Sequence, residues 1–170
     1  MEAAMGKRRM ILLGMAAAVA WGIATVWVGV TQVNLPVFSL LPALAFAFLP
    51  PGVVLLVMIA RLAAVRFFDD GLIDGQAFAP GSAPWVDQRV LTNTVEQLVL
   101  ALCVWPACGY LLLGDGPGVL VALGVAFALA RVAFWIGYRA APPLRAFGFA
   151  ATFSATVAAL LWAGLRYLVS

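Results

Sequence analysis

Three polar side chains, Arg89, Asn93 and Glu96, lie at the beginning of a long apolar segment that continues to about Leu113. Their spacing is i, i+4 and i+7, so on a helix they share one face. A cation, an amide and a carboxylate at membrane depth cost free energy unless they meet partners or a polar ligand. The pattern therefore has two interpretations: a polar clamp between helices, or one wall of a binding site for a small, charged ligand.

A second polar stripe follows in the next apolar segment, where Arg131, Phe134 and Tyr138 occur at i, i+3 and i+7. Arg145 comes seven residues later, just after a pair of prolines. Arg131 lies about two turns before the end of its segment, so its guanidinium can extend to the membrane surface. It can also pair with a partner such as Glu96, and this ion pair would have a purely structural role if it only tied two helices together.

The composition places both stripes in a membrane. Hydrophobic residues make up 65% of the 170 residues and charged residues 10%, whereas soluble domains carry roughly 25% charged residues. We therefore expect an all-α integral membrane protein of one domain's length. The net charge of +3 then reflects the placement of loops, and nucleic acid is not expected as a partner. The sequence has no histidine, and we expect no metal site.

Five membrane-spanning helices are predicted to position these residues. The residues Asn34–Pro36 divide the first two spans, and Pro42, Pro50 and Pro51 should kink or shorten the second. A cleaved signal peptide is the competing interpretation of the first span, but its apolar part exceeds the usual length of about 7–15 residues. The predicted spans are about 10–33, 37–64, 83–113, 118–140 and 144–168.

The basic residues predict the orientation of this bundle. With the N-terminus, the loop at 65–86 and the turn at 139–145 on one side, nine of the ten Lys and Arg residues fall on or near that side. Basic residues favour the cytoplasmic side, so we expect a cytoplasmic N-terminus and polar stripes near the cytoplasmic face. The nine residues are Lys7, Arg8, Arg9, Arg61, Arg66, Arg89, Arg131, Arg139 and Arg145.

The two stripes resemble motifs of the MAPEG family, the membrane-associated proteins in eicosanoid and glutathione metabolism. The first stripe is R-x3-N-x2-E, and the second is R-x2-[FY]-x2-G-Y followed by an arginine seven residues later. The similarity covers about residues 38–168 and looks like a bacterial-type member, in which the segment at 10–33 is additional to the usual four helices. The resemblance implies an extra transmembrane helix in residues 1–36, a four-helix bundle in residues 37–170, and a homotrimer.

The resemblance also implies a ligand, because members of the family hold glutathione between neighbouring protomers near the cytoplasmic face. Arg145 matches the arginine that stabilises the glutathione thiolate, and a cation beside a thiol lowers its pKa and makes it a better nucleophile. Glutathione, as a co-substrate, has two carboxylates that suit arginines and an amine that suits a glutamate. The residues that would bind it are Arg89, Asn93, Glu96, Arg131, Tyr138 and Arg61.

We therefore predict a glutathione-dependent transferase or peroxidase that acts on small lipophilic electrophiles dissolved in membrane lipid, in a bacterial inner membrane. Phe134 stands where many glutathione-using members have tyrosine, and Gln97 replaces an aromatic residue. These differences keep open a second hypothesis, a non-catalytic protein of the same fold that binds a lipid or a partner protein. A third hypothesis, a small transporter or channel, requires polar residues across the full bilayer, whereas here they gather in one leaflet.

Overall fold

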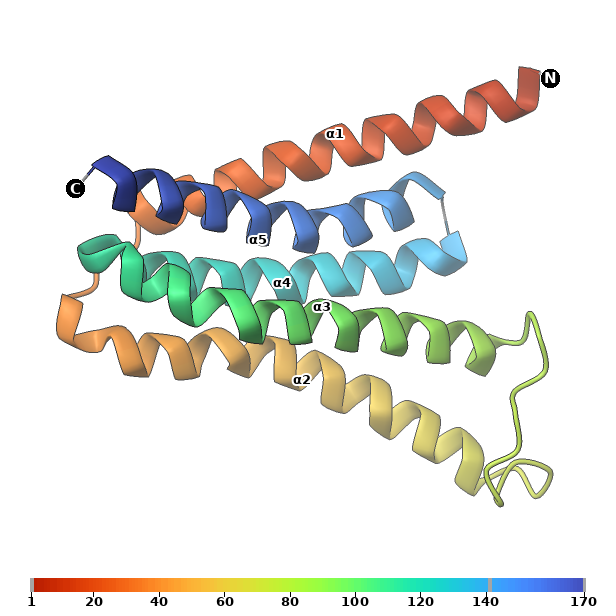
Figure 1. Ribbon diagram of the computed structural model, residues 1–170. Helices are drawn as coiled ribbons and strands as arrows, with labels where there is room; N and C mark the ends of the chain where they lie inside the picture. Colours follow the sequence, from red (N-terminus) through yellow and green to blue (C-terminus); the bar gives the residue numbers. More distant parts are fainter. Residues whose placement is uncertain (1, 141, 170) are drawn as a thin grey trace.

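The computed structural model describes residues 2–140 and 142–169, and every regular element within these ranges is a helix (Figure 1). Each of the five α-helices in this part of the chain is long and apolar enough to cross a membrane. The protein is therefore an integral membrane protein of the all-α class, as the composition predicts. The helices are α1 (Glu2–Thr31), α2 (Leu40–Phe67), α3 (Ala83–Leu111), α4 (Gly116–Ala140) and α5 (Pro142–Val169).

The prolines in the second span do not interrupt it. Pro50 and Pro51 lie inside α2, which is a single α-helix over its full length. The sequence indicated a kink or a shortened span, and Figure 1 shows α2 diverging from α3 towards the end that carries the long loop. Two short 3-10 helices, Val37–Ser39 and Leu113–Asp115, precede α2 and α4.

The central helix of the bundle is α4, which contacts all four other helices. Its buried side chains Leu123 and Phe127 pack in the main apolar core with Trp105 of α3. The Trp105 ring stacks on Phe48 of α2 with the ring centroids 5.4 Å apart, and its Nε1 donates a hydrogen bond of 3.1 Å to Oγ1 of Thr156 on α5. In a bilayer, such close packing and interhelical hydrogen bonds hold helices together, because lipid removes most of the hydrophobic driving force.

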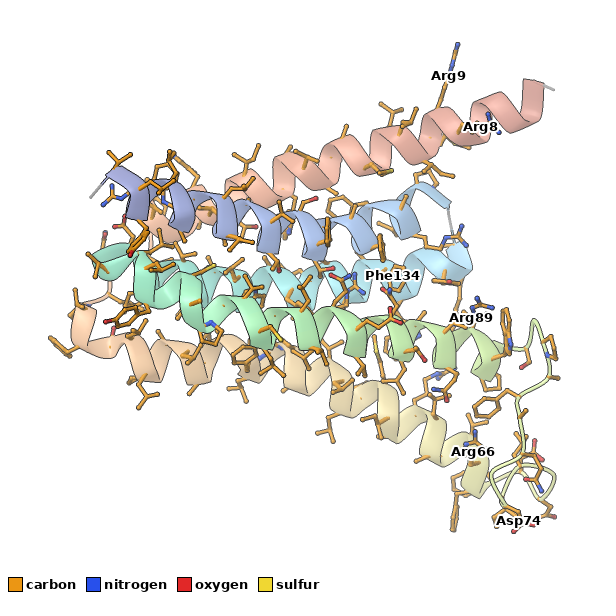
Figure 2. All side chains as sticks on the ribbon, in the orientation of Figure 1. Arg8, Arg9, Arg66, Asp74, Arg89 and Phe134 are labelled. Carbon is orange, nitrogen blue, oxygen red and sulfur yellow. The ribbon has the colours of Figure 1, made fainter. Side chains whose placement is uncertain are left out.

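The beginning of α1, the loop between α2 and α3, the end of α4 and the beginning of α5 all lie at one end of the bundle (Figure 1). Figure 2 shows Arg8, Arg9, Arg66 and Arg89 at this end. The arrangement agrees with the one inferred from the basic residues. The assignment of this end to the cytoplasm stays a prediction.

Candidate functional site

A cavity of about 1040 Å³ opens between α1, α3, α4 and α5. It brings together five of the seven residues that the sequence nominated; these are Arg89, Asn93, Glu96, Tyr138 and Arg145. Phe134 and Phe149 supply apolar wall beside them, and Ile11, Met15 and Val19 of α1 supply the opposite wall. We call this space the polar cavity.

The first turns of α3 set the direction of its polar face. Ser82 precedes the helix, and its Oγ accepts a hydrogen bond of 3.3 Å from the backbone N–H of Trp85, as an N-cap residue does. The Arg89 guanidinium lies over the Trp85 ring, with its Cζ 4.5 Å from the ring centroid. One and two turns further on, Asn93 and Glu96 are joined by a hydrogen bond of 3.2 Å from Nδ2 to Oε2. The i, i+4, i+7 spacing thus forms one polar wall.

The charges in the polar cavity are not neutralised by each other. Among the residues that the structure describes, both ion pairs involve Asp87, and neither involves Arg89, Glu96 or Arg145. Arg145 instead packs against Tyr138, with its Cζ 5.0 Å from the ring centroid. The cavity therefore offers two cations and one carboxylate to a ligand, in a place where unpaired charges are costly.

Arg131 does not line the polar cavity but supports it from within the bundle. Its side chain is fully buried, and its guanidinium donates hydrogen bonds to Asn93 Oδ1 (2.8 Å), the Gly148 carbonyl (2.6 Å) and Thr152 Oγ1 (2.7 Å). It therefore neither extends to the membrane surface nor pairs directly with Glu96, the two alternatives that the sequence left open. Arg131 reaches Glu96 only through Asn93, whose amide orientation it sets.

The two departures from the family motif lie in different places. Phe134 forms part of the cavity wall, and its ring meets Tyr138 edge-on with centroids 5.2 Å apart. A side chain at Gly148 would collide with the Phe134 backbone, so glycine at this position allows α5 to approach α4 closely. Gln97 is buried on another side of α3, where its Oε1 accepts a hydrogen bond of 3.4 Å from Thr152. Only Phe134 therefore changes the surface that a ligand would meet.

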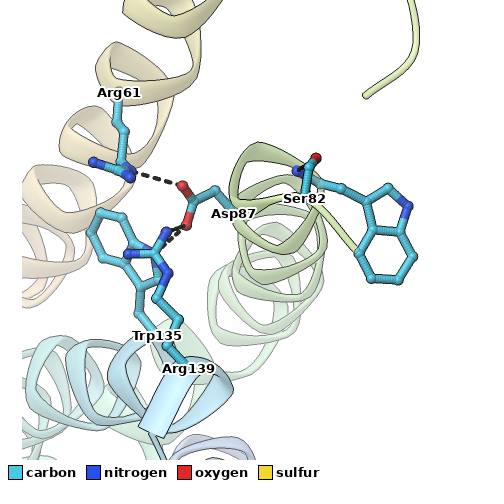
Figure 3. Close-up of polar contacts among 6 residues, drawn as sticks. Arg61, Ser82, Asp87, Trp135 and Arg139 are labelled. Carbon is cyan, nitrogen blue, oxygen red and sulfur yellow. Dashed lines mark hydrogen bonds and ion pairs between the residues drawn. The ribbon is translucent and has the colours of Figure 1, made fainter. Parts of the chain in front are cut away.

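A separate polar cluster ties α2, α3 and α4 together, and it contains Arg61 (Figure 3). Asp87 is buried with 3% of its side chain exposed, and its Oδ2 accepts from Arg61 Nε at 2.7 Å. Its Oδ1 accepts from Trp135 Nε1 at 2.7 Å and from Arg139. The structure thus gives Arg61 a partner in Asp87 and does not bring it to the polar cavity of its own chain.

Sequence reasoning did not single out Asp87 as a site residue. The sequence does indicate a polar face on α4, because Trp135 and Arg139 are four residues apart and share one side of the helix. Nothing in the sequence pairs that face with Asp87, which is 48 residues away from Trp135 along the chain. The α1 wall of the polar cavity was also not anticipated.

Comparison with known proteins gives one finding. The model of the MAPEG family matches residues 39–165. This range includes all the polar residues of the cavity, and it begins after the end of α1. No curated protein and no solved structure matches the chain.

Proposed function

The chain belongs to the MAPEG family, and from this premise we propose that it is a membrane enzyme that binds glutathione in the polar cavity and joins its sulfur to lipophilic electrophiles or uses it to reduce hydroperoxides. The observation that carries this proposal is the set of charges that face the cavity without an ion pair. Arg89 is available to a carboxylate, Arg145 to a second anionic group such as a thiolate, and Glu96 to an amine. Glutathione has this combination of groups together with a thiol.

The proposed roles of the residues follow from their positions. Glu96 receives the amine of glutathione, Asn93 adds a hydrogen bond, and Arg89 binds a carboxylate. Arg145 lies where α5 begins, beside Tyr138, and its charge stabilises the thiolate form of the bound sulfur. Arg131 positions Asn93 from behind.

The chemistry then needs no further acid or base from the protein. In conjugate addition, the thiolate sulfur bonds to the electrophilic carbon, the displaced electron pair moves to the activating group, and water returns a proton. In hydroperoxide reduction, the thiolate takes one oxygen and releases an alcohol. A second glutathione then displaces that oxygen as water and forms the disulfide.

We also propose a homotrimer in a bacterial inner membrane, with the N-terminus and the polar cavity towards the cytoplasm. The resemblance to the family supports the trimer, and the distribution of basic residues supports the orientation. Native mass spectrometry of the purified protein tests the first, and protease accessibility of the loop at 68–82 in oriented vesicles tests the second.

The deciding experiment is a glutathione titration of the detergent-purified protein near neutral pH, with calorimetry for binding and ultraviolet absorbance for the thiolate. A free thiol has a pKa of about 8.5 and carries only a few per cent thiolate at neutral pH. We expect saturable binding and thiolate formation in the wild type, and binding without thiolate in Arg145→Ala.

Arg166→Ala is the matched control for this titration, because Arg166 is exposed in the last turn of α5 and lines no part of the polar cavity. We expect it to behave as the wild type does. An absence of binding at millimolar glutathione would contradict the proposal. It would favour a non-catalytic protein of the same fold that binds a lipid, a reading consistent with the missing hydroxyl at Phe134.

A further inference from the structure

An open groove of about 590 Å³ lies between α2 and α4 and shares no residue with the polar cavity. Its lining is apolar or aromatic except for Arg61, which places a guanidinium at an otherwise apolar surface. We call this space the α2–α4 groove. The residues that line it are Val57, Arg61, Ala64, Val65 and Phe68 on α2, and Trp135 on α4.

The buried carboxylate of Asp87 fixes two guanidiniums beside this groove (Figure 3). Its Oδ2 accepts a hydrogen bond from Arg61 Nε, and its Oδ1 accepts one from Arg139 Nη2. The same Oδ1 also accepts from Trp135 Nε1 at 2.7 Å, which holds the ring that lines the groove. Both arginines are therefore oriented before any ligand binds.

The two arginines carry one positive charge more than Asp87 neutralises. The side chains of Arg61 and Arg139 are 45% and 42% exposed, and among the described residues neither has a second hydrogen-bond partner. Arg61 uses only its Nε, so its two terminal nitrogens stay free to donate. A phosphate group suits such donors, because a guanidinium binds it through paired, charge-assisted hydrogen bonds.

The cluster lies at the depth where a phospholipid carries its phosphate. Arg139 is in the last turn of α4, and Arg61 is about two turns before the end of α2. The loop that carries Asp69, Asp70 and Asp74 extends beyond the end of α2 (Figure 1), and neither ion pair of the described residues includes these aspartates. They therefore leave the surplus positive charge beside the groove in place.

The apolar lining restricts the ligand further. From Val57 to Phe68 the α2 wall is about 16 Å long at 1.5 Å per residue, which a free phosphate ion would leave uncovered. A transmembrane helix of a second copy would bury the arginines at a cost in free energy, and outside α3 no span has an acidic residue at this end of the bundle to pair with them. A lipid supplies both the anion and the hydrocarbon.

From this arrangement we propose that the α2–α4 groove binds an anionic phospholipid, with the phosphate on Arg61 and Arg139 and an acyl chain along the α2 wall. Basic pockets between transmembrane helices bind such head groups. A zwitterionic head group fits less well, because it brings its own cation to a place with surplus positive charge. The bound lipid joins α2 to α4 at the end where α2 diverges from α3 (Figure 1), and it does so independently of glutathione.

The test is native mass spectrometry of the detergent-purified full chain, with phosphatidylglycerol or phosphatidylcholine of the same acyl chains added stepwise. We expect saturable binding of phosphatidylglycerol, with a Kd about fivefold or more below that of phosphatidylcholine. Arg139→Gln should remove this preference by weakening phosphatidylglycerol about fivefold. Arg66→Gln is the matched control, because Arg66 contacts Gln76 and Phe78 and does not line the groove. It should stay within twofold of the wild type.

A second pair of variants tests the acyl-chain wall and keeps both arginines, so it also decides the matter if Arg139→Gln does not fold. Ala63 and Ala64 are both exposed neighbours on α2, but only Ala64 lines the groove. We expect Ala64→Trp to abolish the saturable binding of phosphatidylglycerol and Ala63→Trp to leave it as in the wild type.

Four results would overturn the assignment. Equal affinity of the wild type for both lipids would remove the need for an anion, and equal weakening by Arg139→Gln and Arg66→Gln would reduce the effect to general surface charge. Displacement of the lipid by millimolar inorganic phosphate would leave only an ion site. A changed mass of the assembly in Ala64→Trp, with the lipid count unaltered, would assign the groove to a second copy of the chain.

Discussion

Replacing Arg131 with methionine should both destabilise the bundle and weaken glutathione binding. The side chain is fully buried and makes three short hydrogen bonds, to Asn93, Gly148 and Thr152. Bonds from a charged donor contribute about 1.5–3 kcal/mol each, so the gross loss is about 5–9 kcal/mol. Burying an ion costs several kcal/mol, which methionine avoids. The net loss of stability is then about 2–4 kcal/mol.

This loss can be measured by thermal unfolding in detergent. For a chain of this size each kcal/mol shifts Tm by about 2–4 °C, so we expect a fall of about 5–15 °C. The Kd for glutathione should rise about tenfold, since Asn93 Oδ1 loses the donor that orients its amide. Arg166→Met makes the same substitution at an exposed position and should leave both values unchanged.

The Tm and the Kd for glutathione together decide whether Arg131 positions the ligand. A fall in Tm with unchanged glutathione affinity would mean that Arg131 has only a structural role. An unchanged Tm would refute the hydrogen-bond network of Arg131, because methionine cannot donate the three hydrogen bonds that the buried guanidinium makes.

Three further changes have expected outcomes. Asp87→Asn should lower Tm by about 3–6 °C, because both of its ion pairs are lost; the fall is modest because Arg61 and Arg139 are partly exposed. Glutathione affinity should not change. The control Asp74→Asn, in the exposed loop, should leave Tm unchanged. Glu96→Gln should raise the Kd for glutathione about tenfold but leave a glutathione analogue without the amine unaffected, and equal weakening of both would refute the amine contact. Gly22→Ala should destabilise the protein by about 1–3 kcal/mol through a clash with Ser154, whereas Gly164→Ala, which has open space, should stabilise it by about 0.5–1 kcal/mol.

The membrane spans were predictable because each one is determined by residues that are close together in the sequence. Apolar length gives the helices, and the regular spacing of Arg89, Asn93 and Glu96 gives a shared face that the structure retains. The gathering of Tyr138 and Arg145 on the same cavity followed from the family resemblance. These features depend on residues that are close in sequence or that belong to a known motif.

Partners that are distant in sequence were not predictable in the same way. Arg131 had a plausible carboxylate partner in Glu96, yet its hydrogen bonds go to Asn93 and to α5, because the packing of three helices encloses it completely. Asp87 pairs with cations that α2 and α4 supply, and neither of these arginines is close to it in the sequence. The close approach of Gly22 on α1 to Ser154 on α5 likewise joins positions that are far apart in the sequence.

The packing of α1 on α5 has a consequence for how the protein is made. The two helices run side by side in the bundle (Figure 1), yet the contact between Gly22 and Ser154 joins positions far apart in the order of synthesis. At about 5–20 residues per second, the partner surface emerges on the order of ten seconds after α1 enters the membrane. During that interval the glycine-lined face of α1 is open to lipid and to other nascent chains. The polar cavity, which α1 and α5 both line, is therefore complete only after α5 has been synthesised.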